Sequence, residues 1–165
     1  MSVAVTSNMF KSMMKRFSSG VTIVTYSDNG KMSGITVASF CSVSMEPPLV
    51  LICIDNSAYS LKGLQNAGRF GINICNTDQK EMVYAFASSE IDKNKMIKEE
   101  KHTVTKMGVP LLDSCLVRME CKIVSQHVEG DHTIFVARVE DGKVNRENEG
   151  LVYYKSKIGK FTENE

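Results

Sequence analysis

The stretch VTIVTYSDNGKMSGITVA, residues 21–38, predicts a β-hairpin that begins the fold. Its first part is rich in β-branched residues, which favour strands. Asp28-Asn29-Gly30 then supplies a tight turn, because Asn and Gly tolerate positive φ. The run from Met32 to Ala38 is expected to return antiparallel to the first strand. The fold therefore starts with two strands joined directly, without a crossover helix.

Further strand-like runs follow this hairpin at short intervals. Ser39 to Met45 is strand-like but polar, and Pro47-Pro48 ends it before the apolar strand Leu49 to Ile54. Later strands are expected at Arg69–Cys75, Leu116–Gln126, Thr133–Glu140 and Leu151–Tyr154, with turns at 129–131 and at Asp141-Gly142. Because strands adjoin strands, the pattern predicts a mainly β protein, a small antiparallel barrel with a few peripheral helices. A parallel βαβ sheet fits this order poorly.

Asn8 to Phe17 predicts an N-terminal helix with Asn8 as its N-cap. Its apolar stripe consists of Met9, Phe10, Met13, Met14 and Phe17. These positions share one helical face, which is typical of packing against a core. We therefore assign the stripe to core packing and give it no functional role.

Two further helices and one excursion are expected. Ser57 to Ala67 predicts a short helix that ends at Gly68. Asp78 is expected to cap a helix through Ala87, with Glu81 three residues on as its capping-box partner. Residues 88–108 are polar and rich in Lys, which indicates a surface excursion with a helical turn.

Length and charge narrow the class of protein. We expect one domain over residues 1–165, with the helix at about 8–17, the barrel at about 21–154 and the variable excursion at about 88–108. Hydrophobic residues make up 42% of the chain, which argues against disorder. The net charge of +1 argues against binding nucleic acid through bulk charge. No apolar run reaches the ~18 residues of a membrane helix and no secretory signal is present, so we expect a cytoplasmic location without a membrane partner.

The common catalytic and metal motifs are missing. The five cysteines are Cys41, Cys53, Cys75, Cys115 and Cys121. They form no CxxC pair, so no metal site is expected and reduced thiols are the simplest interpretation. The chain has no GxGxxG, no Walker loop and no GxSxG elbow, which leaves a Rossmann site, a P-loop and a serine hydrolase unsupported.

The strand region from Gly34 to Ser44 is unusually rich in small and hydroxyl side chains. Ser57 and Ser60 add two hydroxyls where the next helix opens. Hydroxyls, backbone N–H groups and a helix N-terminus bind phosphate without lysine. The pattern therefore indicates a site for a phosphorylated ligand. The alternative is that the strand serines face solvent and that Ser57 only caps the helix.

His132 follows Gly130-Asp131 and opens a strand. A histidine at such an edge can donate a hydrogen bond to an anion or a carbonyl in a cleft. The alternative is an exposed or packed histidine without chemistry, because no acid–base partner is visible in the sequence. The Lys-rich residues 93–106 are interpreted as a solvated face, and Phe86-Ala87 at a helix end as core.

Several motifs in this order resemble the short-chain flavin reductase family. They are Phe17–Thr25, Gly34–Phe40, Ser42–Leu51, Arg69–Ile74, Phe86-Ala87 and Gly130–Val139. The most specific combination is the serine-rich run closing on Pro47-Pro48 together with the Gly-Asp-His-Thr strand downstream. The resemblance runs from about Phe17 to Tyr154 and implies an FMN-binding split β-barrel with antiparallel, Greek-key-like strands.

The resemblance also implies a homodimer with the flavin near the subunit interface, and a set of site residues. Thr36, Val37, Ala38, Ser39 and Phe40 would line the flavin and reach its phosphate; Cys53, Ile54 and Asp55 would follow the ribityl chain and ring; Ser57 and Ser60 would hold the phosphate; Phe86 and Ala87 would border the isoalloxazine. His132 would lie beside the nicotinamide as a positioning residue. Residues 88–108 match the family poorly and lack aromatic residues frequent there, which leaves donor preference open.

The function implied is an NAD(P)H:flavin oxidoreductase. A hydride would pass from NADH or NADPH to FMN, with FAD also possible, and electrons would go on to a partner monooxygenase, ferric iron or a small redox protein. The cofactor carries the chemistry while the protein orients two rings, which explains why no acid–base pair is visible. One alternative is an FMN-binding electron carrier, flavoredoxin-like, without nicotinamide activity. A weaker alternative is a non-catalytic barrel that uses its serine-rich surface for protein contacts.

Overall fold

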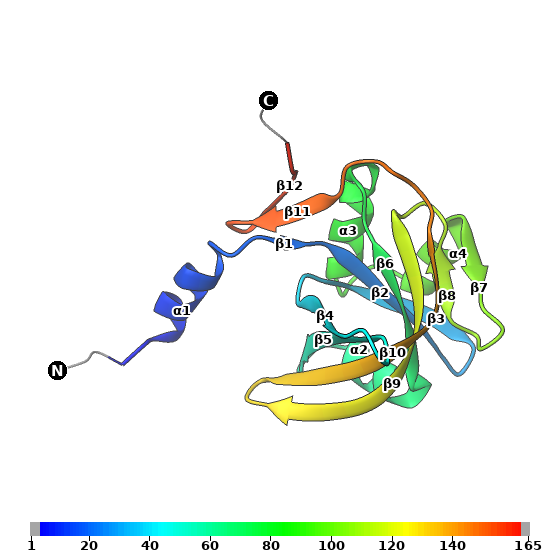
Figure 1. The fold of residues 1–165 in the computed structure, drawn as a ribbon, viewed down its shortest axis with the longest axis horizontal. Coiled ribbons are helices and arrows are strands. Elements are labelled where there is room, and N and C mark those ends of the chain that lie inside the picture. The colour runs from blue at the N-terminus through cyan, green and yellow to red at the C-terminus, as the bar shows by residue number, and fades with distance from the viewer. Residues whose placement is uncertain (1–3, 163–165) are drawn as a thin grey trace.

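The computed structural model describes residues 4–162 and confirms a mainly β, antiparallel fold with peripheral helices (Figure 1). The elements are α1 (Ser7–Met14), β1 (Ser19–Gly20), β2 (Thr22–Asp28), β3 (Lys31–Val37), β4 (Phe40–Ser44), β5 (Leu49–Asp55), α2 (Ser60–Ala67), β6 (Arg69–Ile74), the 3₁₀ turn η1 (Thr77–Gln79), α3 (Lys80–Ala87), α4 (Lys93–Glu99), β7 (His102–Val104), β8 (Pro110–Leu112), β9 (Val117–Glu129), β10 (His132–Val144), β11 (Leu151–Tyr154) and β12 (Lys157–Lys160). No helix among these described residues is long and apolar enough to cross a membrane.

Seven strands form the main sheet in the order β3-β2-β6-β9-β10-β5-β4, and each neighbouring pair is antiparallel. β3 and β4 are the two edges of this sheet, yet only Ala38 and Ser39 separate them along the chain. The sheet must therefore curl until its edges approach each other, which gives an open, split barrel. The β2–β3 hairpin is as predicted, with Asn29 and Gly30 at φ 51° and 78°.

The apolar residues form two clusters that fix this barrel. One fills its interior, where Phe70, Ile72 and Phe135 are fully buried and Leu64 of α2 packs against them. The other is built by β2, α3 and α4 and contains the fully buried Phe86. Burying one such side chain contributes roughly 1.5–3 kcal/mol, so both clusters hold the strands that carry the site.

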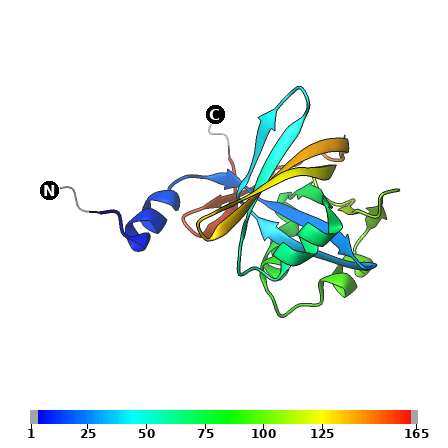
Figure 2. The same ribbon diagram turned by 90° about the horizontal axis from the view of Figure 1, so that it is seen from below.

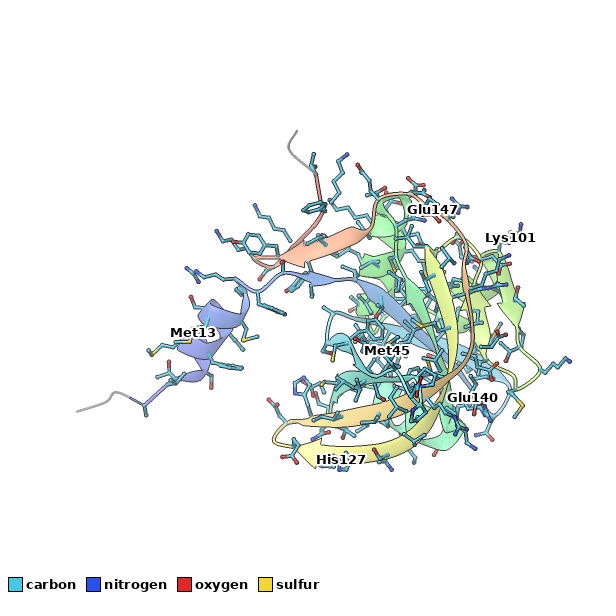
Figure 3. All side chains as sticks on the ribbon, viewed as in Figure 1. Met13, Met45, Lys101, His127, Glu140 and Glu147 are labelled. Carbon is cyan, nitrogen blue, oxygen red and sulfur yellow. The ribbon has the colours of Figure 1, made fainter. Side chains whose placement is uncertain are left out.

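α1 differs most from the sequence-based expectation. It spans Ser7–Met14, and its N-cap is Thr6, whose side chain accepts a hydrogen bond from the Met9 N–H, where Asn8 was expected. None of its residues is buried, and Met9, Phe10, Met13, Met14 and Phe17 are 42–71% exposed. Figure 2 shows the helix standing clear of the barrel, and Figure 3 shows the Met13 side chain on it, away from the sheet. The prediction that the stripe packs on the core is therefore wrong for the single chain.

Two predicted turn and cap assignments are also wrong. Asp78 lies inside η1, which is capped by Asn76 in a capping box with Gln79, and Gln79 precedes α3 without a side-chain cap. Asp141-Gly142 does not turn the chain, because β10 continues to Val144 and Gly142 pairs with Met119 of β9. A register shift next to Asp141 accommodates these residues in the strand.

The expected excursion at 88–108 is only partly a surface segment. It contains α4 and β7, and Lys93 and Ile97 of α4 are buried. At the other end of the chain, β11 and β12 form a hairpin that the sequence did not predict. Its turn holds Lys155 and Ser156 at φ 49° and 63°, angles that Gly or Asn usually adopts. Because neither residue type is present there, the sequence carried no turn signal.

Candidate functional site

An apolar pocket of about 370 Å³ lies where β3 passes into β4. Its walls are Met14, Phe17, Ser19, Ala38, Ser39, Phe40, Cys41, Leu51, Cys53 and Tyr153. Four of the predicted site residues, Ala38, Ser39, Phe40 and Cys53, therefore meet in one cavity. A pocket with apolar walls and few polar groups suits a flat aromatic ligand.

Two hydrogen bonds between Ser39 and Cys53 join the β3–β4 junction to β5 on one side of this pocket. The Ser39 hydroxyl donates to the Cys53 carbonyl at 2.8 Å, and the Cys53 N–H donates to the Ser39 carbonyl at 3.2 Å. Ser39 thus does more than face solvent, which was the alternative interpretation. Partial burial and the neighbouring Cys41 raise the pKa of the Cys53 thiol.

Thr36, Val37 and Ile54 belong to the same strands but face away from the pocket. The Thr36 hydroxyl donates to the Val83 carbonyl of α3 at 2.6 Å. Val37 and Ile54 are 4% and 2% exposed and pack inside the barrel. Val37 and Ile54 can therefore offer a ligand little beyond main-chain groups.

A polar cluster forms where β5 ends beside the β9–β10 turn. Asp55 lies opposite His132 in the β10–β5 ladder. The Asp55 carboxylate accepts hydrogen bonds from the N–H and the hydroxyl of Ser57, both at 2.7 Å. These bonds, with a smaller contribution from His132, lower the pKa of Asp55. The fold thus brings together Asp55, Ser57 and His132, which the sequence places in separate motifs.

The imidazole of His132 is held at this edge and stays accessible. Its Nδ1 lies 2.7 Å from Oδ1 of Asp131, and its side chain is 44% exposed. The Asn56 N–H donates to the Asp131 carbonyl at 2.9 Å, and the Thr133 hydroxyl donates to the Asn56 side chain at 2.7 Å. These bonds join the β9–β10 turn to the end of β5, so the backbone that carries His132 is held in place.

Ser60 carries the most informative polar atom of the site. It is the first residue of α2 and fully buried, and its hydroxyl has no hydrogen-bond partner among residues 4–162. The preceding Tyr59 supplies no side-chain cap, so the N–H groups at this end of α2 lack that partner too. An unpaired buried hydroxyl at a helix N-terminus fits the phosphate of a flavin, which would accept hydrogen bonds there.

Phe86 and Ala87 lie apart from the pocket walls. The Phe86 ring is fully buried in the cluster with α4 and packs against Gly34, while Ala87 is exposed. Their role beside a flavin ring stays a prediction. The walls that sequence reasoning missed include Met14, Phe17 and Tyr153, which come from the two ends of the chain. Only the α1 stripe gave a signal for the first two, and nothing local marks Tyr153.

Comparison with known proteins gives a consistent result. The model of the flavin reductase like domain matches residues 14–162. An NADH-dependent flavin reductase of Rhodococcus sp. is 39% identical over 128 residues, 76% of this chain and 70% of the relative. The reductase subunit HsaB of a flavin-dependent monooxygenase of Rhodococcus jostii is 31% identical over 159 residues, 96% of this chain and 78% of the relative.

Solved structures share the same fold. An NADH:FAD oxidoreductase of Streptomyces globisporus, solved in complex with NAD and FAD fragments, superposes with a TM-score of 0.87 at 27% identity. The match covers 98% of each chain. The split barrel predicted from sequence is therefore confirmed.

Proposed function

The chain belongs to the flavin reductase-like family, and we propose how its pocket serves a reductase of this family. The protein is an NAD(P)H-dependent flavin reductase that supplies reduced flavin to a partner monooxygenase. The observation that carries the assignment of the site is the meeting of Ala38, Ser39, Phe40 and Cys53 in one apolar pocket. When bound, the flavin supplies the ring that accepts a hydride.

The protein's own residues would bind the flavin and orient its ring. Backbone groups of Ala38–Phe40 would hold the edge of the ring, and the apolar wall formed by Leu51 and Tyr153 would exclude water. Ser60 and the N-terminus of α2 would hold the phosphate. We propose FMN as the flavin, as the family resemblance implies, with its phosphate at the Ser60 hydroxyl and the start of α2. NADH is the expected donor, since two of the similar proteins are named for it.

His132 would position the nicotinamide. Its ring lies at the start of β10 beside Asp55, where Asp131 fixes it and it remains accessible. Because the Asp131 carboxylate only accepts, Nδ1 donates to it, and Nε2 of the neutral ring can accept a hydrogen bond from the carboxamide NH2 without taking part in proton transfer. In this role Asp131 orients the imidazole through Nδ1.

A second copy of the chain would complete the protein as a homodimer. The apolar stripe of α1 is exposed along its length, and Met14 and Phe17 at its end already form one wall of the pocket. Exposed apolar faces of this kind mark interaction surfaces. We infer that the partner covers α1 and that the flavin binds close to that contact.

One experiment tests the function directly. The purified protein is mixed anaerobically with FMN and then with NADH or NADPH, and the visible flavin absorbance is followed. A reductase bleaches the flavin with at least one donor. An electron carrier retains FMN but leaves the absorbance unchanged, and a non-catalytic barrel retains no FMN at all.

A further inference from the structure

Lys93 is a buried lysine that neither the pocket nor the His132 cluster uses. It is 5% exposed and begins α4, directly after the N-cap Asp92. Its ammonium donates hydrogen bonds to the main-chain carbonyls of Ala85 and Ser88. It also lies 5.7 Å from the centroid of the Phe86 ring. Both carbonyls lie at the C-terminal end of α3.

Lys93 caps the C-terminus of α3 from outside the helix. The last turn of α3 contains no basic residue of its own, and the chain leaves the helix at Ser88 in an extended conformation. Carbonyls at a helix C-terminus need partners, and a cation there is stabilised by the helix dipole. Lys93, which lies in the next segment of the chain, supplies the hydrogen-bond donors and the positive charge.

α3 in turn is locked to β3, the strand that leads into the pocket. The Phe86 ring contacts Gly34 so closely that a Cβ there would lie 2.8 Å from Cε1. Two residues further on, the Thr36 hydroxyl donates to the Val83 carbonyl at 2.6 Å. α4 adds a direct link, because the Asn94 side chain accepts a hydrogen bond from the Met32 N–H at 3.1 Å.

These links form a continuous physical route from α4 to the ligand pocket. They support β3 at alternate residues, and β3 ends at Val37, one residue before the pocket wall begins at Ala38. The start of α4 therefore supports β3, in contrast to the solvated face expected for residues 93–106.

We propose that Lys93 is a positioning residue for the flavin, which holds α3 against β3 and so sets the place of the Ala38–Phe40 backbone. The proposal rests on the flavin site proposed above. It assigns Lys93 no contact with the flavin. Its effect passes through Phe86 and Thr36, so its loss should alter how the flavin is bound as well as how stable the barrel is.

The test compares Lys93→Met, Lys93→Arg and the control Lys95→Met, whose side chain is 72% exposed. FMN affinity is measured by fluorescence titration, and the visible circular dichroism of bound FMN is recorded well below each Tm. Lys93→Met is expected to weaken FMN binding about tenfold and to change the dichroism, because charged hydrogen bonds to two carbonyls are lost. Lys93→Arg should recover part of both, and Lys95→Met should match the unchanged protein.

A lower Tm with unchanged FMN affinity and dichroism would overturn the proposal, since Lys93 would then be structural only. Should Lys93→Met fail to fold, Lys93→Gln decides, because it removes the charge and shortens the side chain but keeps a polar end. Normal FMN binding and dichroism in Lys93→Gln would equally reject the proposal. If the unchanged protein binds no FMN, the proposed function fails, independently of Lys93.

Discussion

His132 lies directly opposite Asp55 in the β10–β5 ladder, so the histidine that begins β10 stands beside the acidic residue that ends β5. Asp55 is occupied by Ser57, and His132 is held by Asp131. The imidazole is therefore fixed through Nδ1 and remains 44% exposed, which suits a hydrogen bond from its other nitrogen to an incoming ligand.

Replacing His132 by alanine should lower kcat/KM for NADH about fivefold, because one hydrogen bond to the donor is worth roughly 1 kcal/mol. FMN affinity should not change, since the imidazole is placed at the nicotinamide. Steady-state kinetics with NADH and a separate FMN titration check both. His127→Ala is the matched control, as His127 is an exposed histidine on β9 of the same hairpin. Unchanged kcat/KM in His132→Ala would contradict the assigned role.

Ser60→Ala should have opposite effects on the free and the flavin-bound protein. In the free protein it removes an unpaired buried hydroxyl, so the free energy of unfolding should rise by about 1 kcal/mol. FMN should bind about tenfold more weakly, because its phosphate loses a donor. Riboflavin, which lacks the phosphate, is the control ligand and should bind both proteins equally. Equal FMN affinity in both proteins would place the phosphate elsewhere.

Local sequence signals predicted the parts of the fold that local chemistry decides. Asn29-Gly30 defined the β2–β3 hairpin because few residue types adopt its positive φ angles. Asp141-Gly142 carried the same kind of signal yet lies within β10, because pairing with β9 and a register shift override it. Turn residues alone do not reveal such tertiary pairing.

The candidate site divides in the same way. Ala38, Ser39 and Phe40 were predicted together because the family resemblance covers the continuous stretch Thr36–Phe40, and the structure places these three in one pocket. Tyr153 was missed because only the three-dimensional fold brings β11 to this junction. The α1 stripe was correctly identified as amphipathic, but periodicity does not say which chain covers an apolar face.

The double variant Phe10→Asp, Met13→Asp should separate the proposed dimer into monomers. Both side chains lie on the exposed stripe of α1, at 57% and 53% exposure, and charges there would have to be buried on association. Sedimentation velocity at several protein concentrations measures the result. Lys11→Asp is the control: it reverses a charge on the same helix but off the apolar stripe, and it should leave the dimer intact. A dimer that persists in the double variant would mean that association uses another face.

Gly34→Ala should destabilise the protein by about 1–3 kcal/mol, because the added methyl overpacks a filled space. A Cβ at this position would lie 2.8 Å from both Cε1 of Phe86 and the Val24 carbonyl oxygen. Gly159→Ala is the control, since a methyl group added there would meet nothing within 4 Å, and its effect should stay within about 0.5 kcal/mol. Urea unfolding midpoints compare the two. Equal midpoints would show that α3 is not packed against β3 as described.

Thiol labelling should distinguish the five cysteines and report on the pocket. Burial raises the pKa of Cys75 and Cys121 to about 12 and that of Cys115 to about 11. Because the thiolate is the reactive form, these three should stay unlabelled in the folded protein at pH 8. Cys41 is exposed and should react first, with the half-buried Cys53 slower. Mass spectrometry of digested protein after timed alkylation identifies each site.

Bound FMN should slow the labelling of Cys41 and Cys53 together, because both line the apolar pocket. Riboflavin at saturation should protect them equally, since the protection comes from the ring. In urea all five thiols should react, which shows that the reagent is in excess. Undiminished labelling of both residues with FMN bound would place the flavin ring outside this pocket, whereas protection of both would locate it at the β3–β4 junction.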